Sequence, residues 1–150
     1  LLSNAVKRAI RLGEKQAAPR VSDLEALVTS TAGKIEIEAV GDAREDKVIT
    51  KLLQGAVSAV FNRHFTVQEF DDLLTRFHNG MNLEVSDNMP SMEYVHQASE
   101  VKALKNAVAK LGAQGNPAVA ASAVEFVLEG LHLNRRLNKD RSAGGVRYHR

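Results

Sequence analysis

Two arginines near the start of the sequence carry the groups best suited to contact a phosphate. Arg8 and Arg11 share one face of a helix predicted over residues 2–12 with Asn4. A guanidinium offers paired N–H donors to phosphate oxygens and keeps its charge at any physiological pH. A helix that packs its apolar face on its own domain can present these arginines to a bound nucleotide or to water, and the spacing does not choose between the two.

A second set of residues has spacing that suits a metal. Glu93 and His96, and again Glu129 and His132, form Glu-x-x-His pairs, and Glu125 lies one helical turn before Glu129. On helices this spacing is typical of carboxylate-bridged di-iron bundles. Glu129 and His132 are expected on the polar side of their helix, and Glu93 in a first turn, where an acid is favoured anyway. We therefore predict no metal site and keep a carboxylate and histidine bundle as an alternative.

The motifs that hold or hydrolyse a nucleotide are absent from the sequence. A phosphate-binding loop needs Gly-x-x-x-x-Gly-Lys-Ser/Thr, whereas the single Gly-Lys pair, Gly33-Lys34, is followed by Ile35. The His-Glu-x-x-His, Gly-x-Ser-x-Gly and Gly-x-Gly-x-x-Gly motifs are missing too. Since the sequence has no Cys, disulfides, thiolate zinc sites and cysteine nucleophiles are excluded. We predict no catalytic residue in this chain.

The net charge of +2 over 150 residues is distributed unevenly. Residues 1–20 carry a net +4, residues 21–130 a net −7 and residues 131–150 a net +5. Basic ends are typical of solvated helices, and also of surfaces that bind phosphate groups or nucleic acid. Aromatic residues make up 5% and there is no Trp, so a stacking platform for single-stranded nucleic acid is not expected.

The sequence shows no signal for a membrane or for secretion. No stretch approaches 18 consecutive apolar residues, and no charged-then-apolar leader opens the chain. The absence of Cys is compatible with a reducing compartment, and we expect a cytoplasmic location. The first residue is Leu rather than Met, which indicates a piece of something longer.

Apolar residues recur mostly at helical spacing, so the sequence predicts an all-α fold. We expect a bundle of about six helices, divided into two sub-bundles near residues 79–90, with little or no sheet. The expected helices lie at 2–12, from Ser22 to Gly33, at about 45–61, from Thr66 to Gly80, from Ser91 to Gly112 and at about 118–138. Residues 34–40 alternate as in a short strand or an extended linker, and residues 142–150 are expected to form a loose basic tail.

Local signals set the ends and faces of these helices. Ser22 with Glu25, and Thr66 with Glu69, have the spacing of capping boxes. The face of the first helix expected to be buried contains Leu2, Ala5, Val6, Ala9 and Ile10.

Several segments resemble the helical lid that follows the core of AAA+ ATPases, in the branch of the magnesium-chelatase ATPase subunit and the MoxR-like proteins. The similarity is carried by Ser3–Ile10, Gly13–Lys15, Pro19–Leu24, Thr31–Glu38, the helix ending in Val60-Phe61, and Ala123–Lys139. It covers nearly the whole chain. The last of these segments is similar to the C-terminus of bacterial magnesium-chelatase-like proteins.

The resemblance implies a lid-like helical domain over residues 1–65 and a C-terminal helical module over residues 66–150. The Walker motifs and arginine finger would lie before Leu1, so that ATP and Mg²⁺ are bound by a core outside this sequence. Arg8 best matches the lid arginine that senses nucleotide, and Arg11 is the second candidate. This chain alone would not be an enzyme, while its parent would be an oligomeric ATPase.

The implied partners are the ATPase core itself, its ring neighbours and a client or chelatase protein. Hydrolysis would be coupled to remodelling of that partner. A basic helical nucleic-acid-binding module and a carboxylate and histidine metal bundle remain as alternatives, with nucleic acid and membrane not expected as partners of the lid.

Overall fold

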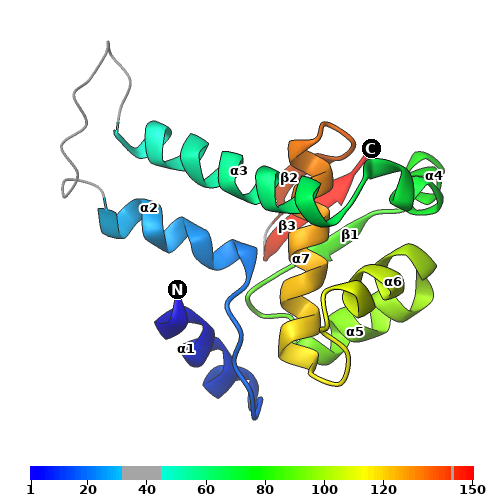
Figure 1. Cartoon of the computed structure of the whole chain (residues 1–150). Coiled ribbons are helices and arrows are strands. Elements are labelled where there is room, and N and C mark those ends of the chain that lie inside the picture. Colours follow the sequence, from blue (N-terminus) through cyan, green and yellow to red (C-terminus); the bar gives the residue numbers. More distant parts are fainter. Residues whose placement is uncertain (32–44, 143) are drawn as a thin grey trace.

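The computed structural model describes residues 1–31, 45–142 and 144–150. Within them the helices are α1 (Leu2–Leu12), α2 (Glu25–Thr31), α3 (Glu45–His64), α4 (Asp71–His78), α5 (Ser91–Glu100), α6 (Lys102–Lys110) and α7 (Pro117–Leu133). Two 3₁₀ turns, η1 (Val21–Leu24) and η2 (Val67–Phe70), precede α2 and α4. The strands are β1 (Leu83–Val85), β2 (Asn138–Ser142) and β3 (Gly145–His149). Figure 1 shows α1 and α2 on one side of α7, with α4, α5 and α6 on the other.

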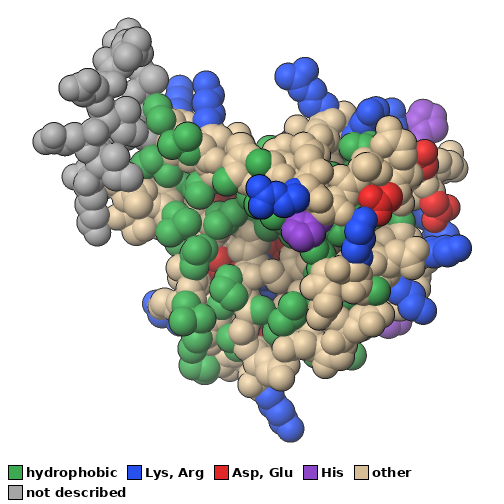
Figure 2. All heavy atoms as spheres, in the orientation of Figure 1, with side chains coloured by type: hydrophobic (Ala, Val, Ile, Leu, Met, Phe, Trp, Pro, Cys, Tyr) green, Lys and Arg blue, Asp and Glu red, His purple; other side chains and the backbone are tan. Residues whose placement is uncertain are grey.

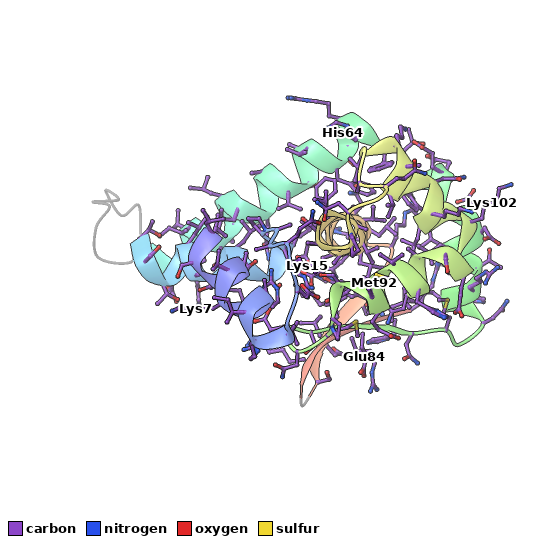
Figure 3. All side chains as sticks on the ribbon, turned by 90° about the horizontal axis from the view of Figure 1, so that it is seen from below. Lys7, Lys15, His64, Glu84, Met92 and Lys102 are labelled. Carbon is purple, nitrogen blue, oxygen red and sulfur yellow. The ribbon has the colours of Figure 1, made fainter. Side chains whose placement is uncertain are left out.

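Helix α7 is the centre of the molecule because it is apolar around most of its circumference. Helices α3, α5 and α6 pack against it, and Figure 3 shows it nearly end-on with the other elements around it. Its start follows the sequence signals, since Asn116 accepts the backbone N–H groups of Ala118 and Val119 and Pro117 occupies the first turn. A helix that is apolar around most of its surface is expected in a core, and eleven of the 17 residues of α7 are buried.

The aromatic side chains from the end of α3 and from η2 gather beside α7. Phe61, Phe65 and Phe70 form a cluster with ring centroids 5.4–5.9 Å apart. The inward face predicted for the helix after Thr66 is confirmed: Phe70, Leu73, Leu74 and Phe77 are all buried. The predicted capping box is confirmed too, because the Glu69 carboxylate accepts the backbone N–H of Thr66 (2.8 Å).

The small antiparallel sheet is a departure from the expected fold. Its strand order is β1-β3-β2, with Leu83 opposite Tyr148 and Val85 opposite Val146. Leu83, Val85 and Tyr148 are buried, so one face of the sheet joins the core. The described part of the chain is therefore mostly helical with a three-stranded sheet, and the residues predicted as a loose tail provide β3.

The last helix ends earlier than the apolar spacing predicts. Helix α7 stops at Leu133, not near residue 138. The side chain of Asn134 donates to the carbonyl of Gly130 (2.8 Å), and Arg135 adopts a positive φ of 59°. A residue in the left-handed region ends a helix, and the chain then turns back into β2.

The capping box predicted from Ser22 and Glu25 is wrong. Arg20, not Ser22, precedes the first 3₁₀ turn, and the Asp23 side chain accepts the Arg20 backbone N–H (2.8 Å).

The predicted strand or linker at 34–40 lies outside the described residues. A domain boundary after residue 65 stays a prediction and coincides with the end of α3. No described helix is both long and apolar enough to cross a membrane.

Candidate functional site

Helix α1 carries the predicted phosphate-binding arginines, but it is rotated relative to the expected orientation. Its buried residues are Ala5, Arg8 and Ala9. The larger apolar side chains expected to be buried are instead exposed: Leu2 is 65%, Val6 41% and Ile10 75% exposed. Two alanines allow the close approach of the helix, and the acceptors that surround Arg8 make its burial possible.

Arg8 is enclosed by oxygen acceptors. Its guanidinium donates to both carboxylate oxygens of Asp23 (2.9 and 3.0 Å), to Asp87 (3.2 Å) and to the carbonyl of Ala18 (3.0 Å). Burial works against the charge, but the hydrogen bond and attraction to Asp23 outweigh it, so the pKa of Arg8 is raised above its usual value. Arg8 thus ties α1 to η1 and to the loop before α5.

Arg11 has a different environment. It is exposed, and it donates one hydrogen bond to the carbonyl of Asp87 (2.7 Å). Lys7 lies on the same helix and Lys15 follows the helix, and both are exposed. Figure 3 labels both lysines. Arg8 and Arg11 thus lie three residues apart on α1, with Arg8 buried and Arg11 at the surface.

A second buried arginine was not singled out by the sequence. Arg20 is 3% exposed and donates to the carbonyls of Ser86 and Met89 and to the Ser91 hydroxyl (3.1–3.3 Å). Its guanidinium also lies 4.6 Å from the centre of the Tyr94 ring. On the same side, Glu14 accepts the backbone N–H and the hydroxyl of Ser91.

Two carboxylates of α7 are buried, which corrects their predicted place on a polar face. Glu125 is 2% and Glu129 5% exposed. Glu125 accepts the Tyr94 hydroxyl (2.8 Å), and Glu129 accepts the Tyr148 hydroxyl (2.6 Å). Burial, together with the nearby carboxylates, raises the pKa of Tyr94 and Tyr148, so both phenols stay protonated and donate.

A signal for this burial was present in the sequence. Between Pro117 and Leu131, Glu125 and Glu129 are the only charged residues in a run that is otherwise apolar or small. Carboxylates surrounded by apolar residues on all sides of a helix must be buried with donors, or the helix must be exposed. The donors come from distant parts of the chain, so the spacing alone could not identify them.

The two Glu-x-x-His pairs do not meet. His132 directs Nδ1 to the carbonyl of Leu137 (3.0 Å), whereas His96 is exposed beside Glu100 (3.5 Å). Among the residues that the structure describes, no group of three or more His, Cys, Asp or Glu side chains could hold a metal ion.

Three of the six basic residues in the C-terminal segment pair with acidic side chains, while Arg135, Arg136 and Arg150 are exposed. Lys139 pairs with Glu129 (2.8 Å), Arg141 with Glu25 (3.1 Å) and Arg147 with Glu84 (2.6 Å), as part of the hairpin's own packing. A nucleic-acid surface needs cations that are available to phosphates. The three paired cations therefore give the nucleic-acid alternative no specific support.

Comparisons with protein-family models, with curated proteins and with solved structures find no match for this chain.

Proposed function

We propose that this chain is the non-catalytic C-terminal part of a magnesium-chelatase-like, MoxR-like AAA+ ATPase. In this proposal the chain closes over ATP and Mg²⁺ held by a core outside the sequence, and it couples hydrolysis to the remodelling of a client or chelatase partner. The parent would act as a cytoplasmic oligomer. The chain itself supplies binding surface and charge but no catalytic group.

The exposed face of α1 is the observation that carries the proposal. Leu2, Val6 and Ile10 follow one another at four-residue spacing and stand in solvent, and Figure 2 shows hydrophobic side chains gathered over α1, α2 and α3. An apolar stripe of this kind marks a surface that another body covers. Lys7 and Arg11 lie on the same helix, which favours a partner with negative charge, as a nucleotide-loaded core has.

The two arginines take different parts in this proposal. Arg8 holds α1 against Asp23, so it sets the orientation of the helix. Arg11 has donors in solvent at the same turn and is the residue we assign to the nucleotide phosphates. Arg8 would affect nucleotide binding indirectly, because it fixes the orientation of the helix that carries Arg11.

The first test is the coding sequence before Leu1, which is expected to encode a phosphate-binding loop followed by an acidic strand end. The second test measures ATP hydrolysis by that longer polypeptide. Arg11→Ala is expected to lower turnover at least about tenfold, since it removes a charge-assisted contact to phosphate. Lys15→Ala is the matched control and should leave turnover unchanged.

Circular dichroism of each variant separates this effect from unfolding. Unchanged turnover in Arg11→Ala, or an upstream sequence with no phosphate-binding loop, would contradict the proposal. Salt-sensitive binding of duplex DNA by the 150-residue chain at physiological ionic strength would favour the nucleic-acid alternative instead.

A further inference from the structure

A cleft of about 670 Å³ lies between α2, α3, α7 and the hairpin of β2 and β3. Its walls are largely apolar and include Val28 of α2, Leu53 and Val57 of α3, and Leu133 of α7. Glu125 and Glu129 of α7 also line it. Figure 2 shows the molecule hollowed on this face, with acidic side chains visible inside the hollow. Apolar walls with a few polar groups at depth are typical of small-molecule sites.

Glu125 is buried at this cleft, and no described Lys, Arg or His lies within ion-pair distance of it. Its two oxygens accept the Tyr94 hydroxyl (2.8 Å) and the Ser22 backbone N–H (3.1 Å), which are neutral donors. Both oxygens of Glu125 are therefore already bonded, and a free acceptor at this cleft must come from another residue.

Glu129 has one oxygen that no protein group uses. Lys139 Nζ (2.8 Å) and the Tyr148 hydroxyl (2.6 Å) both donate to Oε2, and no described residue donates to Oε1. In the described part of the chain, the only fully buried side-chain nitrogen or oxygen without a hydrogen-bond partner is Gln97 Oε1. Glu129 Oε1 also has no partner but is not fully buried, so it reaches solvent. Since Glu129 lines the cleft and is 5% exposed, that solvent is the cleft.

We propose that this cleft binds a primary alkylammonium group. The ammonium donates to Oε1 of Glu129, and its aliphatic stem packs on Val28, Leu53 and Val57. The inference concerns α7 and its neighbours, and it does not depend on the proposed ATPase function.

Charge and geometry select this ligand over the alternatives. Four acidic residues line the cleft against two basic ones: Glu25, Asp87, Glu125 and Glu129 against Lys139 and Arg141. This balance disfavours an anion. A divalent metal ion needs several oxygen ligands, whereas a single free oxygen with apolar walls suits one ammonium on a hydrocarbon stem.

The protein already contains an example of the same contact. Lys139 places an ammonium on an aliphatic stem at Oε2 of Glu129, 5.9 Å from the centre of the Tyr148 ring. A ligand ammonium at Oε1 would share the carboxylate with Lys139. Removing the Lys139 charge should therefore strengthen ligand binding, which a merely structural role of Glu129 would not predict.

The binding test titrates the 150-residue chain with n-hexylammonium, with n-hexanol as the neutral match, by calorimetry and methyl NMR. The ammonium is expected to bind at least about tenfold more tightly than the alcohol, because a charge-assisted hydrogen bond replaces a neutral one. Methyl shifts should concentrate on Val28, Leu53 and Val57. Equal binding of both compounds, tighter binding of Mg²⁺, or shifts elsewhere would overturn the assignment.

Variants test the role of the carboxylate. Glu129→Gln should weaken hexylammonium at least about tenfold, and exposed Glu100→Gln is its control. Lys139→Met should tighten binding several-fold, whereas Lys110→Met, which removes a distant surface charge, should not. An unchanged affinity in Lys139→Met overturns the proposal even where Glu129→Gln fails to fold. If the chain binds capped lysine more tightly than hexylammonium, the ligand is a lysine side chain of a partner protein. If it binds hexylammonium more tightly, the ligand is a free amine.

Discussion

Gly130 is the position where the crossing of α3 and α7 can be tested most sharply. A Cβ added there would have three ring carbons of Phe61 within 2.7 Å. The ring cannot move aside, since Phe61 is fully buried and its centroid lies 5.5–6.1 Å from those of Phe65, Phe70 and Phe126. Gly130→Ala therefore forces α3 away from α7 or distorts the aromatic cluster.

The magnitude follows from two opposing terms. Alanine stabilises a helix interior by about 1 kcal/mol relative to glycine, while overpacking a core costs about 1–3 kcal/mol. Gly55→Ala, in α3, measures the helix stabilisation alone, because nothing lies within 4 Å of a Cβ added at Gly55. We expect Gly55→Ala to raise the free energy of unfolding by about 1 kcal/mol and Gly130→Ala to lower it by up to about 2 kcal/mol, so that the two variants differ by about 1–3 kcal/mol.

Urea unfolding followed by circular dichroism measures both variants. Each kcal/mol should also move Tm by about 2–4 °C for a chain of this size. In a Phe61→Leu background the cost of Gly130→Ala should shrink, because the smaller side chain removes the overlap. A Gly130→Ala protein as stable as Gly55→Ala would refute the close packing of α3 on α7.

Further predictions concern the buried ionisable groups. Arg8→Leu should lower the free energy of unfolding by about 3 kcal/mol, because it leaves the Asp23 carboxylate buried without its cation, whereas Arg11→Leu should cost less than about 1 kcal/mol; urea unfolding compares the two, and equal costs would contradict the buried pair. Burial raises the pKa of Tyr94 and Tyr148 in the folded chain, so above about pH 10 the unfolded chain alone loses these protons. The free energy of unfolding should then fall with rising pH by about 1.4 kcal/mol per unit for each tyrosine. Phenolate absorbance should appear only with unfolding, and its appearance in a chain with native circular dichroism would contradict this environment.

Some local helix signals predicted the structure correctly, although the capping box of Ser22 and Glu25 was wrong. Helix α1 spans the predicted residues 2–12, and the capping box of Thr66 and Glu69 is present in the structure. Each of these signals acts within a few residues, through backbone conformation or a nearby hydrogen bond. Such interactions need no knowledge of the rest of the fold, which is why the sequence predicts them.

The sheet depends instead on contacts across the chain. β3 lies between β1 and β2, and its pairing of Val146 with Val85 joins residues far apart in sequence. Strands of three to five residues give a weak alternating pattern, and the basic residues of 142–150 suggested a loose tail. Arg147 of β3 pairs with Glu84 of β1, so basic composition did not exclude a strand.

The faces of α1 and α7 were assigned wrongly for one physical reason. A helical wheel assumes that polar residues face water, yet burial depends on whether a buried charge finds partners. Arg8 finds Asp23, and Glu125 finds Tyr94 and the Ser22 backbone, so these polar residues are inside while Ile10 remains outside. The two surfaces that carry our proposals, the apolar stripe of α1 and the acidic cleft beside α7, exist because polar partners distant in sequence reversed the local preference.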